Sequence, residues 1–356
     1  MSVPRPAAKT FFHDFWRGLT TPDLKALKIA LVILLGLLGL VSELAHNFRH
    51  RVEDGEVSWS SVTHDSCRAS ILAMRGAQLE TDPSFKTLVF AGPSALRCWL
   101  PHPDDADRLA SSATGAPVRV LSMCSNRQSY AFTAALLDRF GADFDGWFVL
   151  GVSRQTIGRA AAEEETDYHR RESRILGFDS KVLRLESAWL GCPQEPPIGW
   201  EAWDRRAFYH QCQLGFWLPE SHHPAYDPYM PRTFIPMDAV RAGIAPLSGE
   251  DLQRHLGVLA RAAARIRGRG HARLALVETP WVDTFTPAMQ TPEWMKDEAA
   301  YQQTMAAWSR EHDVPWLTMP AGFEASAADF ADPRHIATPT LRIQFLESVT
   351  RDLLAR

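Results

Sequence analysis

The sequence predicts an α/β domain with a mostly parallel sheet, preceded by one N-terminal transmembrane helix. In the long C-terminal part, short apolar runs alternate with amphipathic segments, which is typical of strand–helix units whose helices cover both faces of a sheet. Near the N-terminus, one segment of about 20 residues is almost wholly apolar, which is the length needed to cross a bilayer core. These two observations divide the chain into an anchor and a domain.

The predicted anchor covers residues 26–45 and is flanked by lysines at its start. No small-residue cleavage site follows it, which favours an uncleaved signal anchor over a cleaved signal peptide. Residues 1–25 have an excess of Lys and Arg and are expected to form a short cytoplasmic tail, so that the rest of the chain faces outward. Residues 46–80 are expected to form a stalk and a first helix, and residues 81–356 the domain.

Within the domain, each expected strand is a short run rich in Val, Leu, Phe or Trp. The runs lie at residues 87–90, 118–122, 147–150, 273–277 and 315–318. Helices are expected at residues 94–100, 129–139, 302–312 and 340–354, the last with clear amphipathic spacing. Ligands of such sheets bind at the carboxyl ends of the strands, so polar residues just past these ends are the candidates for a site.

Two stretches depart from this alternation. Residues 101–115 are expected to form a polar connection. Residues from about 155 to 250 begin charged and then become rich in Pro, Trp, His and Tyr. A long insertion of this kind in a compact domain is usually functional, as a lid or a binding loop.

The composition argues against several classes of function. The net charge is −4, so the chain lacks the broad basic field expected of a nucleic-acid-binding protein. No Cys-x-x-Cys pattern is present, and His210, Cys212, His222 and His223 have no standard zinc spacing. The sequence therefore predicts no metal and no cofactor.

The five cysteines leave an odd thiol in an oxidising compartment. Cys192 and Cys212 could form one disulfide, and Cys98 and Cys124 another. Buried thiols are an equally good interpretation of each pair.

Three residues point to nucleophilic catalysis. Ser94 follows the first strand in a Gly-x-Ser turn, and Asp332 stands three residues before His335 near the C-terminus. A serine hydroxyl needs a histidine base, and the base needs an orienting carboxylate. Alternatively, Ser94 could be a helix N-cap, and Asp332 a cap beside a surface histidine.

Further candidates lie past the ends of other strands. Asn126 and Ser153 could donate hydrogen bonds to an oxyanion, whereas Asn126 could also be a turn residue. Arg127 and Arg154 could bind an anionic substrate, although arginine is usually solvated. Glu278 could contact a substrate or simply lie where the chain leaves a strand.

The order Ser94, Asp332, His335 resembles the SGNH/GDSL hydrolase superfamily, with Ser94 in its block I and Asp332-x-x-His335 in its block V. With one N-terminal membrane helix, the chain is most similar to the DltD-like group, which is linked to acyl transfer onto cell-envelope polymers. The resemblance implies a three-layer domain. It also implies an oxyanion hole made by the nucleophile's own N–H, where Asn126 and Ser153 stand in for the usual block II Gly and block III Asn.

Together these features predict a membrane-anchored, extracytoplasmic serine acyltransferase or esterase. Its substrate would be an ester-linked acyl group of an envelope polysaccharide or lipid, transferred through an acyl-serine. The expected location is the inner membrane, with the C-terminal domain in the periplasm and a membrane-embedded acyl-donor protein as a partner. The alternative is a catalytically inactive module that binds glycan or scaffolds an envelope complex, which the altered blocks favour.

Overall fold

The computed structural model describes residues 28–40, 43, 84–125, 128–140, 145–158, 181–190, 246–268, 272–320 and 322–356. The chain divides into two compact units, Met1–Arg51 and Val52–Arg356. In the first unit, residues 28–40 are helical, and their large apolar side chains are exposed.

The predicted anchor at residues 26–45 extends past the described helix at both ends. Within the described ranges, no helix combines the length and the apolar character needed to cross a membrane. The predicted tail at 1–25 and the predicted stalk at 46–80 lie outside the described residues.

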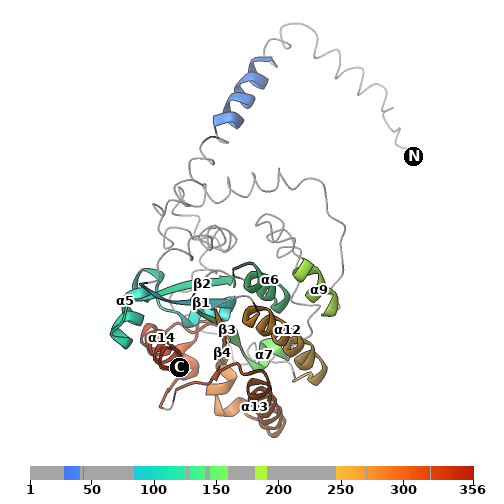
Figure 1. Cartoon of the computed structure of the whole chain (residues 1–356), viewed down its shortest axis with the longest axis vertical. Helices are drawn as coiled ribbons and strands as arrows, with labels where there is room; N and C mark the ends of the chain where they lie inside the picture. Colours follow the sequence, from blue (N-terminus) through green and yellow to red (C-terminus); the bar gives the residue numbers. More distant parts are fainter. Residues whose placement is uncertain are drawn as a thin grey trace, which may run out of the picture. The chain divides into compact units, whose positions relative to one another are not determined.

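The second unit contains a five-stranded sheet in the order β2-β1-β3-β4-β5, and every neighbouring pair is parallel (Figure 1). The strands are β1 (Lys86–Pro93), β2 (Val118–Ser125), β3 (Gly146–Val152), β4 (Arg273–Glu278) and β5 (Trp316–Leu317). All five predicted strands are present, and the predicted parallel α/β sheet is confirmed. Central strands buried on both faces read as continuous apolar runs, which is why they were visible in the sequence.

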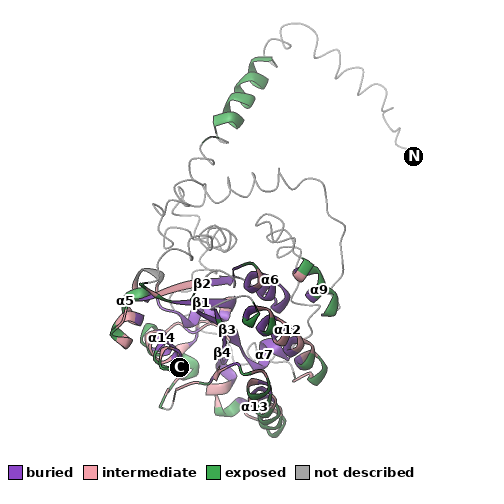
Figure 2. Cartoon of the chain, in the orientation of Figure 1, coloured by how far each residue is buried: buried purple, intermediate pink, exposed green. Residues whose placement is uncertain are grey.

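Helices cover both faces of this sheet. Alternate strand residues point to opposite faces, so Val89 and Phe148 belong to one core and Leu88 and Trp147 to the other. The first core is closed by α6 (Tyr130–Phe140), α9 (Lys181–Trp189), α12 (Gly249–Arg267) and α13 (Pro292–His312). The second is closed by α4 (Ser94–Trp99), α5 (Pro103–Thr114) and α14 (Pro339–Leu354). Figure 2 shows the buried strands and the exposed outer faces of α9 and α13, whereas α6 is buried almost throughout.

Shorter elements complete the description: α7 (Arg154–Ile157) and the 3-10 turns η6 (Val282–Phe285), η7 (Pro287–Met289) and η8 (Ala327–Asp329). Local signals explain where the long helices begin. The Ser248 hydroxyl accepts a hydrogen bond from the Asp251 N–H at the start of α12, and Thr291 does the same for Trp294 at the start of α13. Proline in the first turn adds to the second signal.

Two sequence predictions about these helices were wrong. Residues 101–115 are not a polar connection but contain α5, whose Ala106 and Ala110 are buried against the second core. Small alanines four residues apart give a weak apolar signal among many polar residues. The helix α13 begins at Pro292, well before the expected start at residue 302, because Thr291 and Pro292 form a start signal.

The described residues at the two ends of the expected insertion lie next to each other. Its described ends meet where the Ser248 N–H donates to the Gly158 carbonyl at 3.1 Å. Most of residues 155–250, including Cys192 and Cys212, lie outside the described residues. Of the other pair, Cys98 and Cys124 are buried thiols rather than a disulfide.

Candidate active site

Two glycines set the position of Ser94 at the end of β1. Gly92, the penultimate residue of β1, has φ +153°, a conformation that residues with a Cβ rarely adopt. Gly151 at the end of β3 lets α4 pack closely, since a Cβ there would lie 2.7 Å from the Cβ of Leu96. Ser94 therefore becomes the first residue of α4 at the carboxyl edge of the sheet.

Ser94, His335 and Asp332 lie in hydrogen-bond contact. Ser94 Oγ is 2.9 Å from His335 Nε2, and His335 Nδ1 is 2.5 Å from Asp332 Oδ2. With the Nδ1 proton donated to Asp332, Nε2 can accept the proton of the Ser94 hydroxyl. All three residues are only half-buried, so the group is accessible from solvent.

The loop that carries Asp332 and His335 is closed by its own hydrogen bonds. Asp332 Oδ1 accepts from the backbone N–H groups of Arg334 at 2.8 Å and His335 at 2.9 Å. Phe330 and Ile336 form an antiparallel bridge across the loop. Burial acts to raise the pKa of Asp332, but the hydrogen bond and charge of His335 and the two N–H donors outweigh it. The pKa of Asp332 is therefore lowered, which keeps its carboxylate ionised.

The structure gives Ser153 a structural contact. Its side chain is buried and forms a capping box with Thr156 at the start of α7, with the two hydroxyl oxygens 3.1 Å apart. Thr156 in turn contacts the Tyr130 hydroxyl at 3.1 Å. The oxyanion role of Ser153 stays a prediction.

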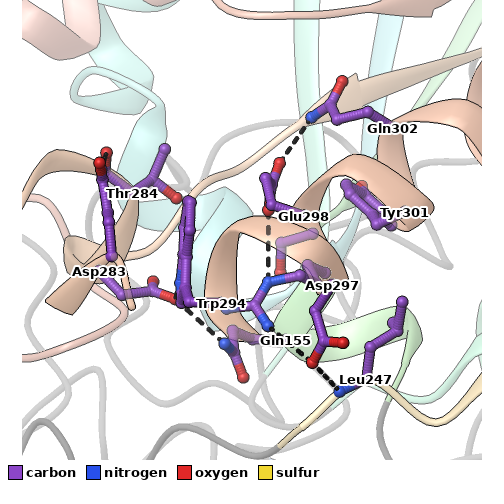
Figure 3. A network of polar contacts seen from close by, with 12 residues as sticks. Gln155, Leu247, Asp283, Thr284, Trp294, Asp297, Glu298, Tyr301 and Gln302 are labelled. Atoms are coloured by element: carbon purple, nitrogen blue, oxygen red, sulfur yellow. Dashed lines mark hydrogen bonds and ion pairs between the residues drawn. The ribbon is translucent and has the colours of Figure 1, made fainter. Parts of the chain in front are cut away.

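Arg154 is buried and already paired with carboxylates, and its predicted contact with an anionic substrate stays a prediction. Its side chain is 5% exposed and pairs with Asp283 at 2.8 Å, Glu298 at 3.3 Å and Asp297 at 3.9 Å. Its guanidinium also lies 5.1 Å from the centre of the Trp294 ring. Figure 3 shows this network, with Asp283 and Trp294 on one side and Asp297 and Glu298 on another. Three carboxylates already surround the guanidinium.

Glu278 is also buried, and its predicted substrate contact stays a prediction. It accepts a hydrogen bond from the Tyr301 hydroxyl at 2.7 Å. Burial and the charge of Glu298 raise the pKa of Glu278 to about 8, although the Tyr301 hydrogen bond and Arg154 act against this. Glu278 is therefore mostly protonated at neutral pH.

The remaining predicted donors can be placed only in part. Asn126 and Arg127 lie outside the described residues. The backbone N–H of Ser94 belongs to the first turn of α4, where helical N–H groups have no intrahelical acceptor and can donate to a ligand.

No cluster of three His, Cys, Asp or Glu side chains suited to a metal occurs in the part of the chain that the structure describes. His210, Cys212, His222 and His223 fall outside that part.

The sequence did not reveal the partners of Arg154 and Glu278. Asp283 lies in a 3-10 turn with no motif around it. Trp294, Asp297 and Glu298 are three and four residues apart, so they share one face of α13. The sequence prediction did not show this shared face because it placed the start of the helix at residue 302.

The fold and the two hydrogen bonds define a class: an α/β protein in which a serine, a histidine and an aspartate are bonded in the order found in serine hydrolases. No protein-family model matches the chain, and no curated protein matches it in sequence. Among solved structures, it is similar to a Bacteroides fragilis protein provisionally described as an acylhydrolase. The identity is 11% over 79% of this chain and 95% of that chain, with a TM-score of 0.39. These values are too low to transfer a function, so the class rests on the geometry alone.

Proposed function

We propose that this chain is a membrane-anchored serine acyltransferase or esterase of the SGNH/GDSL type, related to the DltD-like group. Its substrate would be an ester-linked acyl group of a cell-envelope polysaccharide or lipid. The observation that supports this most directly is the Ser94 Oγ to His335 Nε2 contact at 2.9 Å, with His335 Nδ1 held by Asp332.

The first half of the reaction acylates the enzyme. Ser94 Oγ attacks the acyl carbonyl carbon, and His335 Nε2 takes the hydroxyl proton. Asp332 stabilises the imidazolium that forms, without itself taking the proton. The Ser94 N–H and Asn126 donate to the oxyanion. Collapse breaks the ester bond, and the leaving alcohol takes the proton from His335.

The second half returns the enzyme to its starting state. His335 removes a proton from the acceptor hydroxyl, which attacks the acyl-Ser94 carbonyl. Breaking the bond to Ser94 Oγ returns the proton to the serine. A sugar hydroxyl as acceptor gives transfer, and water gives hydrolysis.

Residues 26–45 would hold this site in the inner membrane, with the domain in the periplasm. A single helix cannot translocate an acyl donor, so a membrane-embedded partner would supply the acyl group. The exposed apolar side chains of residues 28–40 support an anchor, because such a surface is unstable in water. A reporter fused after Arg356 should be active only outside the cytoplasm, and cytoplasmic activity would contradict this topology.

A fluorophosphonate probe tests the nucleophile. We expect the folded protein to be labelled at Ser94, as located by mass spectrometry, and His335→Ala to abolish labelling without unfolding the protein. His312→Ala is the matched control, because His312 also lies beside a carboxylate, that of Glu311 at 3.9 Å, but on α13. Folded wild-type protein that remains unlabelled would refute the proposal, and labelling of His335→Ala at the wild-type rate would refute the base.

A catalytically inactive glycan-binding or scaffolding module is the second candidate. The contact between Ser153 and Thr156 favours it, because that hydroxyl is already engaged. Glycan binding by wild-type protein that shows neither labelling nor acyl transfer would support this alternative.

A further inference from the structure

The ion pair between Arg154 and Asp283 connects the end of β3 to the loop of the proposed base. We propose that this pair positions the proposed catalytic base. The pair holds η6 in place, and η6 holds the Asp332–His335 loop at the distance at which His335 reaches Ser94. This inference rests on the proposed function, since it assigns the pair a role in that reaction. Arg154 and Asp283 are thus positioning residues that do not touch substrate.

The sheet fixes the backbone that carries Arg154. The capping box of Ser153 sets the first turn of α7 directly after β3. The last carbonyl of that strand, on Val152, accepts the Thr279 N–H at 2.8 Å. The start of α7 and the segment that follows β4 are therefore joined at the carboxyl edge of the sheet.

Asp283 is the point at which three elements meet. Its side chain is 2% exposed, and Oδ2 accepts from Arg154 Nη2 at 2.8 Å, Gln155 Nε2 at 3.1 Å and Trp294 Nε1 at 2.7 Å. Arg154 and Gln155 belong to α7, whereas Trp294 belongs to α13. One carboxylate oxygen thus ties η6 to both helices.

The other side of η6 contacts the residues between the proposed acid and base. The Val282 N–H donates to the Pro333 carbonyl at 3.0 Å. Trp281, which precedes η6, is buried, and the Arg334 guanidinium lies 4.6 Å from the centre of its ring. Pro333 and Arg334 are the two residues that separate Asp332 from His335. A shift of η6 would therefore move this loop.

The charges around Arg154 show which partner to change. Arg154 keeps two further carboxylate neighbours, Glu298 at 3.3 Å and Asp297 at 3.9 Å, so its charge stays compensated when Asp283 is replaced. Removing Arg154 would instead leave the buried Asp283 carboxylate uncompensated, which destabilises a protein strongly. Asp283 is consequently the cleaner position for a test.

The test uses the full chain and a generic aryl acetate. We expect Asp283→Ala to lower kcat and the rate of Ser94 labelling about 10- to 100-fold while KM changes less than about threefold, because small misplacements slow an oriented reaction. Asp283→Asn, which restores an acceptor oxygen of the same shape, should recover part of this loss. The low-field NMR resonance of the proton between His335 Nδ1 and Asp332 Oδ2 should be weaker in Asp283→Asn than in wild-type protein. It should be weakest in Asp283→Ala.

The matched control is Glu186→Gln. Glu186 is a fully buried carboxylate on α9 that bonds Arg261 and Arg265 of α12, each at 2.5 Å. This variant should lower the unfolding temperature and leave kcat and the resonance unchanged. It separates a loss of stability from a loss of positioning.

An Asp283→Ala protein that folds and keeps both kcat and the resonance at wild-type values would overturn the proposal. If Asp283→Ala does not fold, Asp283→Asn is judged by the same two measurements. Wild-type protein that shows neither turnover nor labelling would refute the proposed function. The resonance would then still decide whether Asp283 positions the loop.

Discussion

His335 is oriented by a carboxylate only three residues away, so the acid and the base are set by one short loop. Asp332 uses Oδ2 for the imidazole and Oδ1 for two backbone N–H groups. These bonds hold the Asp332 side chain within the loop. The two residues between Asp332 and His335 also contact Trp281 and η6, so the geometry of the Asp332–His335 bond depends on η6 in the proposed inference.

Glu278 leads to a prediction about stability and pH. Its pKa is raised from 4.5 to about 8, so between these values the folded protein holds a proton that the unfolded chain releases. The stability from this proton is complete below the unfolded pKa and is lost as the pH rises toward 8. The expected slope in the free energy of unfolding is at most about 1.4 kcal/mol per pH unit.

Glu278→Gln should remove this slope, because the amide does not titrate and its oxygen can still accept from Tyr301. Denaturant unfolding at pH 5 and pH 8 checks the expectation, with the exposed Glu311→Gln as control. An unchanged difference between the two pH values would show that Glu278 is ionised in the folded state.

At the scale of elements, the close approach of α4 to β3 gives a further prediction. Gly151→Ala would place a methyl group 2.7 Å from Leu96 Cβ, so α4 must move. We expect a loss of about 1–3 kcal/mol in the free energy of unfolding, as for other overpacked cores. Because Ser94 begins α4, its labelling by the fluorophosphonate probe should also slow.

Gly249→Ala is the control for that change, since nothing lies within 4 Å of a Cβ built at Gly249. Chemical denaturation and labelling kinetics of the two variants give the comparison. Equal stability of Gly151→Ala and wild-type protein would mean that α4 tolerates the methyl group.

Features set by residues close together in the sequence could be predicted, and features set by distant residues could not. The strands were predicted because parallel strands are continuous apolar runs, and the Asp332–His335 contact because it closes within three residues. The pairing of Arg154 with Asp283 spans 129 positions and has no periodic pattern. Arginine is usually solvated, so its burial here could not be read from neighbouring residues.

For the whole molecule, the proposed anchor and the proposed catalytic residues fall in different compact units. The polar contacts that support the proposed reaction, from Ser94 to the Arg154 network, lie in the unit Val52–Arg356. The unit Met1–Arg51 contributes the exposed apolar helix at residues 28–40. If the proposal holds, changes in the proposed anchor should alter location without altering the contacts among Ser94, His335 and Asp332.

Substitutions in the anchor test this division. We expect the wild-type chain to stay in the membrane fraction after an alkaline carbonate wash. Leu34→Arg together with Leu37→Arg should release much of it, since an arginine at the centre of a spanning helix costs about 2.5–3.5 kcal/mol. Leu34→Ile with Leu37→Ile keeps the segment apolar and should leave the chain in the membrane.

Released protein should still be labelled at Ser94. A wild-type chain that washes off would contradict the anchor, and released, folded protein without labelling would show that the site depends on the membrane.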